Sequence, residues 1–114
     1  MAAMPPTLPY LGEFEYAVLL AVMQLGEDAY AVPMREWIET RSGRPVARGA
    51  LYTALERLER KGCLRSRMGD PSPERGGRAR RYFAVSPLGL RALRSTHTAF
   101  ARLSQGLEAI LEES

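Results

Sequence analysis

The apolar positions between residues 12 and 25 predict an N-terminal helix that is buried on two sides. Glu13 and Glu15 fall in its first turn, where negative charge favours a helix N-terminus. The apolar side chains cover more than one stripe of this helix: Phe14, Val18, Leu19, Val22, Met23 and Leu25. One side can pack on the helix's own domain, and we expect the other side to face a partner chain.

Two further helices are predicted before residue 63. The first starts near Tyr30, which leaves Pro33 in the opening turn where proline is tolerated, and Gly43 ends it. The second spans residues 47–62, where leucines recur at i, i+4 and i+7 and form one apolar stripe: Leu51, Leu55 and Leu58. Its opposite face begins with small or hydrogen-bonding side chains.

A pair of short strands with a basic turn follows these helices. Residues 63–68 alternate between apolar and polar side chains, which is typical of an edge strand, and residues 82–85 form the returning strand. Residues 69–78 between them are rich in glycine, proline and arginine, and glycine permits a tight turn. The pattern therefore predicts a β-hairpin with an arginine-rich tip.

The last element is predicted to be one long helix. Ser86 is a favourable N-cap and Pro87 suits the first helical position. Apolar residues then follow helical spacing: Leu90, Leu93, Phe100, Leu103, Leu107, Ile110 and Leu111. A helix over this span has roughly 24 residues and a length of about 36 Å, which is longer than the preceding domain needs. A second copy of the chain is the simplest cover for its distal end.

This order of elements predicts a mostly α (α+β) fold, a winged helix-turn-helix with a C-terminal dimerisation helix. We divide the chain into a flexible N-terminal arm (1–10), a winged helix DNA-binding domain (11–86) and a C-terminal dimerisation helix (87–114). The predicted homodimer interface uses apolar residues of the first and last helices: Phe14, Val18, Phe100, Leu103, Leu107 and Ile110.

Charge is distributed unevenly along the 114 residues, although the formal net charge is only +3. Residues 1–40 hold one cation and six acids, residues 41–81 hold twelve cations and four acids, and residues 82–114 hold three of each. A general preference for arginine over lysine does not explain this clustering. The concentrated basic middle indicates a polyanion bound on one face.

The third helix and the hairpin are therefore the candidate DNA-binding elements. Small residues allow close approach to base edges in the major groove, while arginines reach phosphates or the minor groove. The candidate contacts on the helix are Arg48, Gly49, Ala50, Tyr52, Thr53 and Arg57. The candidate contacts on the wing are Arg75, Arg78, Arg80 and Arg81. A solvated helix face and a loop without function are the simpler alternatives.

Other chemistry finds little support in the sequence. The single cysteine, Cys63, and the single histidine, His97, fall in separate elements, so we expect no enzyme, no metal site and no cofactor. Cys63 suits a core position. No apolar run approaches the ~20 residues that span a membrane, and the N-terminus lacks the pattern of a secretion signal. A lone cysteine fits a cytoplasmic location.

Two adjoining stretches, GALYTALERLERKGCLRSRMG and ERGGRARRYFAVSPLGLRAL, resemble the PadR family of transcriptional regulators. The resemblance covers residues 11 to about 95, and the shared positions are Gly49 to Tyr52, Leu55, Leu58, Lys61, Gly62, Arg80 to Tyr82 and Ser86 to Gly89. The single C-terminal helix is similar to that of the short PadR subgroup, which dimerises through this helix and the first one.

The resemblance implies a homodimeric repressor that binds operator DNA and, as is often the case in this family, is released by a small aromatic or drug-like ligand. A ligand-free autoregulator that sets expression levels is the alternative. Carried onto this chain, it places Tyr52 and its neighbours on DNA and Arg78, Arg80 and Arg81 on the wing. Two recognition helices in successive major grooves would require an inverted-repeat operator. Two departures are visible: Ala31 and Pro33 replace a common Gly-Tyr step, and the last helix has no tryptophan to stack a drug.

Two other functions stay open from the sequence. In the first, the protein is a small-molecule sensor whose dimer cavity is the working site and whose DNA binding is secondary. In the second, it is an adaptor whose basic face binds an acidic protein. Trp37 lies with Met34 and Ile38 on the second helix, where packing is the simpler interpretation and ligand stacking the alternative.

Overall fold

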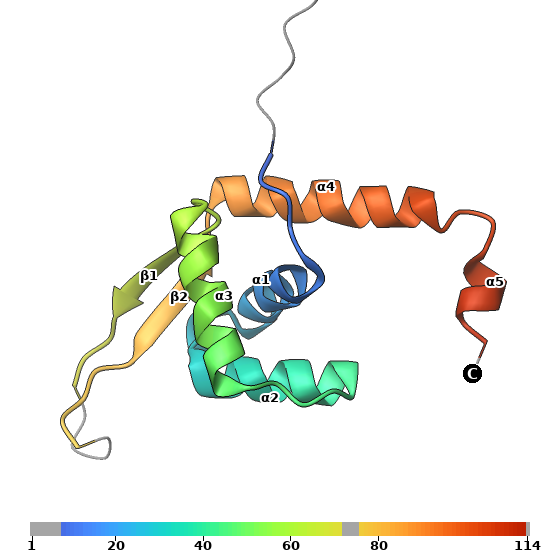
Figure 1. Cartoon of the computed structure of the whole chain (residues 1–114). Coiled ribbons are helices and arrows are strands. Elements are labelled where there is room, and N and C mark those ends of the chain that lie inside the picture. The colour runs from blue at the N-terminus through green and yellow to red at the C-terminus, as the bar shows by residue number, and fades with distance from the viewer. Residues whose placement is uncertain (1–7, 72–75, 114) are drawn as a thin grey trace, which may run out of the picture.

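The structure is a computed structural model that describes residues 8–71 and 76–113. Its helices are α1 (Glu13–Leu25), α2 (Ala31–Ser42), α3 (Arg48–Arg60), α4 (Pro87–Leu103) and α5 (Glu108–Leu111), with a 3-10 turn, η1 (Gly26–Asp28), after α1. Strands β1 (Leu64–Met68) and β2 (Arg81–Val85) form an antiparallel hairpin. Figure 1 shows α1 surrounded by α2, α3 and α4, with the hairpin extending to one side. Arg75 and residues 1–7 of the predicted arm lie outside the described residues.

The helix boundaries follow the predicted start and stop signals closely. At the start of α1, the backbone N–H of Gly12 donates to Glu15 Oε1 at 3.0 Å. Tyr30 precedes α2 in an extended conformation, and Gly43 ends it in the left-handed region, at φ 71°. Since Pro33 is the third residue of α2, its missing N–H costs no intrahelical hydrogen bond.

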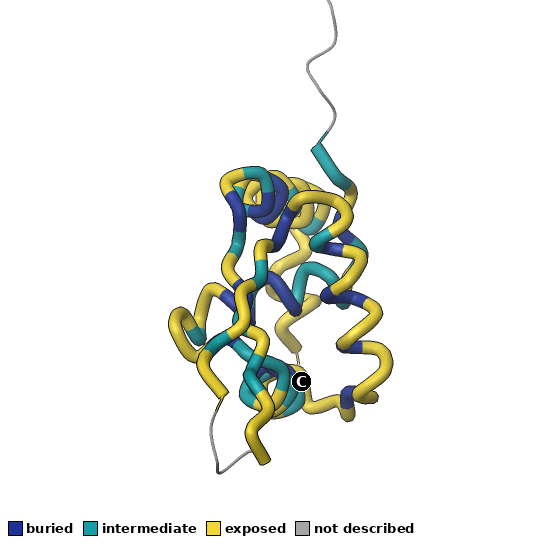
Figure 2. The backbone as a smooth tube through the Cα atoms, turned by 90° about the vertical axis from the view of Figure 1, so that its left-hand side faces the viewer, coloured by how far each residue is buried: buried dark blue, intermediate teal, exposed yellow. Residues whose placement is uncertain are grey.

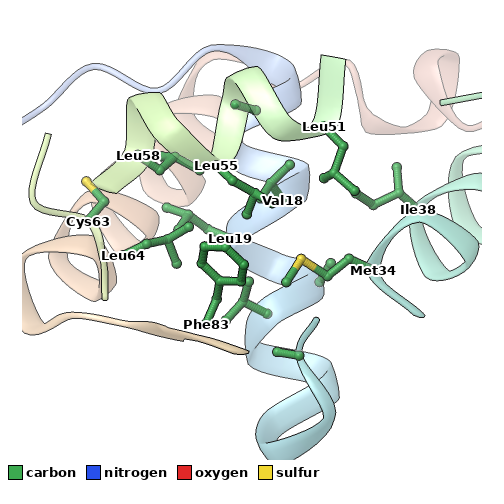
Figure 3. Packing of buried hydrophobic residues seen from close by; sticks show 14 of the residues in the cluster. Val18, Leu19, Met34, Ile38, Leu51, Leu55, Leu58, Cys63, Leu64 and Phe83 are labelled. Carbon is green, nitrogen blue, oxygen red and sulfur yellow. The ribbon is translucent and has the colours of Figure 1, made fainter. Parts of the chain in front are cut away.

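The core is built where the leucine stripe of α3 meets α1 and α2. Leu19, Met34, Leu51 and Leu58 are among the largest fully buried side chains, and Figure 3 shows them converging with Phe83 from the hairpin. Burying side chains of this size contributes about 1.5–3 kcal/mol each. Figure 2 shows buried positions alternating with exposed ones along the helices, so the opposite face of α3 remains in solvent.

The hairpin is attached to the helical core at both of its strands. Its register pairs Leu64 with Val85 and Met68 with Arg81. Leu64 and Phe83 are buried and anchor β1 and β2 to the core. The backbone N–H of Phe83 also donates to the carbonyl oxygen of Ala29 at 2.9 Å, which joins β2 to the segment between η1 and α2.

The start of α4 packs closely on the end of α3, and this contact depends on two residues of the predicted motif. Ser86 Oγ accepts from the backbone N–H of Gly89 at 3.0 Å and donates to the carbonyl oxygen of Gly62 at 2.5 Å. A Cβ atom at Gly89 would lie 2.2 Å from the carbonyl oxygen of Cys63. Only glycine therefore permits the observed distance between α4 and the start of β1.

The C-terminal segment differs from the predicted single helix. Helix α4 ends at Leu103, and the short α5 begins only at Glu108. Gly106, between them, has φ 91°, a conformation that a helix cannot contain. Ser104 Oγ donates to the carbonyl oxygen of Phe100 at 3.0 Å, a local bond that competes with continued helix. The prediction of one continuous helix over residues 87–111 was therefore wrong.

One predicted interface residue is placed differently from the expectation. Val18 is fully buried in the core of its own chain, because it lies on the side of α1 that faces the core. It offers no surface to a partner, and we remove it from the proposed interface. Phe14, on the same helix, is half-buried and packs against the core edge. Among the described residues, no helix is long and apolar enough to cross a membrane.

Candidate nucleic-acid interface

The outward face of α3 brings together all six predicted contact residues of this helix. Arg48, Gly49, Ala50, Tyr52, Thr53 and Arg57 are all exposed. The other side of the helix is buried through Leu51, Ala54, Leu55 and Leu58. Tyr52 leaves 51% of its surface exposed, so its ring does not pack into the domain core. The periodicity of the leucines thus determines which residues α3 presents to solvent.

The beginning of α3 is held in place by the segment that leads into it. Val46 is buried, and its backbone N–H donates to Glu39 Oε2 at 2.8 Å, while its carbonyl oxygen accepts from Arg35 Nε at 2.7 Å. Both side chains belong to α2. A Cβ atom added at Gly49 would have no neighbour within 4 Å, so the first turn of α3 presents a low, unobstructed surface. Such a surface can approach base edges and phosphates closely.

The wing carries its described arginines in different environments. Arg78 and Arg81 are exposed, whereas Arg80 is half-buried. Gly76 and Gly77 have φ values of 67° and 80°, which glycine adopts without strain. The chain can therefore turn at these two glycines without strain. Arg75, the remaining predicted wing contact, lies outside the described residues.

Four side chains hold the base of the wing against α2, and we call them the wing-stem stack: Arg67, Tyr82, Tyr30 and Arg80. The guanidinium of Arg67 lies 4.7 Å from the ring centroid of Tyr82. The Tyr82 and Tyr30 rings meet edge to face, with centroids 5.6 Å apart. The guanidinium of Arg80 lies 4.2 Å from the Tyr30 centroid. These are distances at which cation–π and aromatic attraction operate.

A groove separates the wing from α3. Its volume is about 630 Å³, and its lining includes Tyr30, Tyr52, Arg78, Arg80 and Arg81. Glu56 and Glu59 of α3 also line it, so the groove is basic on the wing side and acidic on the lower part of the helix. This polarity allows a polyanion to contact the wing and the first turns of α3, while the acids disfavour phosphate near the end of α3.

Sequence reasoning did not assign a role to Tyr30 or Tyr82 in this site. Arg67 and Tyr82 are opposite each other in the hairpin, so their contact follows once the register is known. Tyr30 lies far from both in the sequence, and its ring meets Tyr82 next to the point where Ala29 accepts a hydrogen bond from Phe83 of β2. A charge pattern therefore identified the arginines, but it could not identify the aromatic surfaces that hold them.

The far end of the molecule exposes a group of apolar side chains. The exposed fraction is 48% for Phe100 and Leu107, 75% for Leu103 and 66% for Ile110. These are the predicted interface residues of the C-terminal segment. The Phe100 ring meets Tyr16 of α1 edge to face, with centroids 6.3 Å apart, which joins this group to the outer side of α1.

Other groups with potential chemistry have structural surroundings. Cys63 is fully buried, as the core interpretation predicts, and burial raises the pKa of its thiol, so the reactive thiolate is disfavoured. His97 Nδ1 shares a hydrogen bond with the Tyr16 hydroxyl at 3.3 Å. Within residues 8–71 and 76–113, no three His, Cys, Asp or Glu side chains are grouped to hold a metal ion.

An ion pair links α1 to the end of the candidate recognition helix. Lys61 Nζ donates to both carboxylate oxygens of Glu15 at 2.8 Å and to the carbonyl oxygen of Tyr10 at 3.1 Å. Burial alone would raise the pKa of Glu15, but hydrogen bonds from Lys61 and Gly12 and the positive charges of Lys61 and Arg57 lower it overall. Glu15 is thus a charged structural contact at neutral pH.

Comparison with known proteins identifies what this arrangement resembles. A family model described as the transcriptional regulator PadR-like family matches residues 19–95. A PadR family transcriptional regulator from Eggerthella lenta DSM 2243 is 30% identical, with 85% of this chain and 82% of that chain covered and a TM-score of 0.64. A Streptococcus transcriptional regulator is 26% identical, with 87% and 92% covered and a TM-score of 0.68.

A third solved structure shows that the fold persists at lower identity. A PadR-like transcriptional regulator from Bacillus cereus strain ATCC 14579 is 19% identical, with 89% of this chain and 93% of that chain covered and a TM-score of 0.69. A search among curated proteins gave no match. Together with the order of helices and strands, the structural matches confirm the predicted winged helix fold.

Proposed function

Because this chain belongs to the PadR-like family of transcriptional regulators, and is therefore a DNA-binding regulator and not an enzyme, we propose that it is a homodimeric repressor of a specific operator. The operator would be an inverted repeat, because a two-fold dimer presents two identical recognition helices to successive major grooves about 34 Å apart.

The observation that carries this proposal is the placement of α3 and the wing on either side of one groove. The residues exposed on the first turns of α3 are small or hydrogen-bonding, and the opposite wall carries Arg78, Arg80 and Arg81. In this proposal, Ala50 and Thr53 approach base edges, while the arginines contact the phosphates beside them. Tyr52, 51% exposed beside the groove, can contact either.

Support for a homodimer comes from the apolar side chains at the C-terminal end. Leu103 and Ile110 are mostly exposed in the single chain, and with Phe100 and Leu107 they are apolar enough to favour association. A second copy is the simplest cover, because each chain brings the same surface to a two-fold interface. The outer side of α1, which carries the half-buried Tyr16 and the exposed Met23, would continue this interface.

The proposed function can be tested without knowing the operator in advance. Selection from a pool of random duplexes should enrich an inverted repeat, and fluorescence anisotropy should show that two chains bind each selected site. The DNA upstream of the protein's own coding region is the first natural candidate, and an inverted repeat there would support autorepression. Selection of a single, unrepeated half-site bound by one chain would contradict the homodimeric repressor.

Release by a small aromatic ligand is a separate part of the proposal. Its support is the apolar, aromatic character of Phe100 and its edge-to-face contact with Tyr16 at the proposed interface. Planar aromatic cations, titrated into the complex of the protein with labelled operator, should release the DNA. The anisotropy should then fall with ligand concentration and reach a plateau. A ligand that quenches Trp37 fluorescence while operator binding is absent altogether would instead favour the small-molecule sensor.

A further inference from the structure

The wing is held firmly up to Arg80. The last ladder pair of the hairpin joins Met68 and Arg81, and the backbone N–H of Gly69 then donates to the carbonyl oxygen of Arg80 at 2.7 Å. On the tip side of Arg80, the described chain contains Arg78 and then Gly77 and Gly76, which both have positive φ values. Any contact that acts on Arg80 therefore acts on the stem from which the wing tip extends.

The wing-stem stack supplies such a contact from outside the hairpin. Tyr30 is the residue before α2, a helix whose side chains Arg35 and Glu39 also hold the segment leading into α3. The guanidinium of Arg80 rests on the Tyr30 ring, and Tyr82 supports that ring from the hairpin side. The wing stem contacts Tyr30, at the start of α2, and the segment before α3 contacts Arg35 and Glu39 of the same helix. Helix α2 therefore holds both the wing stem and the start of α3.

The position of Tyr30 within the groove indicates what the contact determines. Tyr30 lines the groove together with Tyr52 of α3 and Arg80 of the wing. The width of the groove sets whether α3 and the wing can touch one duplex at the same time. Because Arg80 is drawn toward the ring at the groove wall, the aromatic face of Tyr30 fixes the stem relative to α3.

We propose that Tyr30 is a positioning residue for DNA binding: through the wing-stem stack it holds Arg78 and Arg81 where they contact phosphates while α3 occupies the major groove. This inference rests on the proposed DNA-binding function and adds a residue that acts through the wing. The contacts of Tyr30 are made by its ring, so phenylalanine should replace it, whereas leucine keeps apolar volume but loses the aromatic face.

The test compares the full-length wild-type protein, Tyr30→Phe and Tyr30→Leu on one selected duplex by fluorescence anisotropy over a salt series. Tyr30→Leu should bind at least about tenfold more weakly, and the slope of log K against log salt should become shallower by up to about 3.6, because the dimer loses two wing contacts in each chain and each lost phosphate contact removes about 0.9. Tyr30→Phe should match the wild type. Tyr10→Leu is the matched control, since Tyr10 is 85% exposed and is not a member of the wing-stem stack.

A double-mutant cycle shows whether Tyr30 acts through the wing. In a chain that already carries Arg78→Ala and Arg81→Ala, the change Tyr30→Leu should weaken binding by less than twofold. Full additivity, a Tyr30→Phe variant as weak as Tyr30→Leu, or a Tyr30→Leu variant with wild-type affinity and slope would each overturn the positioning role.

Two further outcomes are distinguishable from these. If the wild type itself binds no duplex with a salt-dependent affinity, the proposed function fails and the role of Tyr30 fails with it. Circular dichroism checks that the variants fold, and Tyr82→Leu replaces Tyr30→Leu if the latter does not. Loss of folding in both leucine variants would assign the stack to domain stability and overturn the inference.

Discussion

At the scale of single residues, Gly89 shows how closely one position can be constrained. A Cβ atom there would lie 2.2 Å from the carbonyl oxygen of Cys63 and 2.9 Å from a methyl carbon of Val85. We expect Gly89→Ala to lower the free energy of unfolding by about 3 kcal/mol, because the clash is with backbone and α4 must shift. Urea denaturation followed by circular dichroism measures this loss.

Gly49→Ala is the matched control for this prediction. A Cβ atom at Gly49 would meet nothing within 4 Å, and Gly49 lies inside a helix. Alanine should therefore stabilise the chain by about 0.5 kcal/mol, because glycine is the poorer helix former. Equal effects of the two substitutions would show that close packing at Gly89 is not what requires glycine.

Glu15 gives a prediction about pH. Its folded-state pKa lies below the ordinary value of 4.5, so on acidification the unfolded chain binds the proton first. The stability from the Lys61 contact should thus be complete above pH 4.5 and disappear as the pH falls below that value. The melting temperature of the wild type should be higher than that of Glu15→Gln at pH 7, and this difference in melting temperature should shrink by pH 3. A difference that grows on acidification would contradict this.

Residue-scale reasoning from the sequence was strongest where the signal was local. Ser86 was predicted as an N-cap, and its hydroxyl accepts from Gly89 as expected. The sequence could not show that Val18 faces the core and not a partner chain, because α1 is apolar around much of its circumference. The role of Tyr30 depends on contacts between distant segments, which no local pattern contains.

At the scale of elements, α3 and the wing should contribute to binding in different ways. Thr53→Ala changes a side chain expected at base edges, so it should reduce the preference for the selected site by about 1–3 kcal/mol and barely alter binding to random duplexes. Arg78→Ala with Arg81→Ala should weaken binding to both kinds of duplex about equally. Competition fluorescence anisotropy with the selected and the random duplex measures both affinities, and their ratio gives the sequence preference of each variant.

The result that would count against this division is specific. If the double arginine variant lost its preference among sequences while Thr53→Ala lost only general affinity, the roles of the two elements would be reversed. Thr98→Ala, the same change at an exposed position of α4 away from the recognition helix, serves as the control for Thr53→Ala and should leave the preference for the selected site unchanged.

The C-terminal segment carries the element-scale prediction about assembly. Leu103→Glu with Ile110→Glu places two charges among exposed apolar side chains, and we expect the chain to become monomeric at micromolar concentration. Thr98→Glu, at an exposed polar position of α4, is the control and should leave the dimer intact. Sedimentation velocity distinguishes the two states. A dimer that survives the double substitution would place the interface elsewhere.

Elements were predictable where periodicity and end signals agreed. The positions of α2 and α3 and the pairing of the two strands follow from leucine spacing, glycine stops and alternation. The break between α4 and α5 was missed, because the apolar spacing continues through residues 104–107 while Ser104 and Gly106 interrupt the backbone. Periodicity reports which side chains are apolar, and it does not report whether the backbone remains helical.

At the scale of the whole molecule, the two proposed surfaces lie at different parts of one chain. Figure 1 shows the hairpin and the α5 end on opposite sides, and the principal dimensions are 55 × 44 × 22 Å. A dimer formed through α4 and α5 would thus leave each wing free to reach DNA. From the charge distribution, with twelve of the sixteen cations in residues 41–81, the sequence predicted only that a polyanion binds on one face, and the distance between the two surfaces depends on the fold.

The central claim is that arginines of the wing and α3 hold a duplex through its phosphates. The most direct test is the affinity of the wild-type protein for one selected duplex, measured by anisotropy between about 50 and 200 mM salt. We predict a linear fall of log K against log salt with a slope of about −5 or steeper, as six or more phosphate contacts from a dimer require. An affinity that does not change over this range would contradict the account.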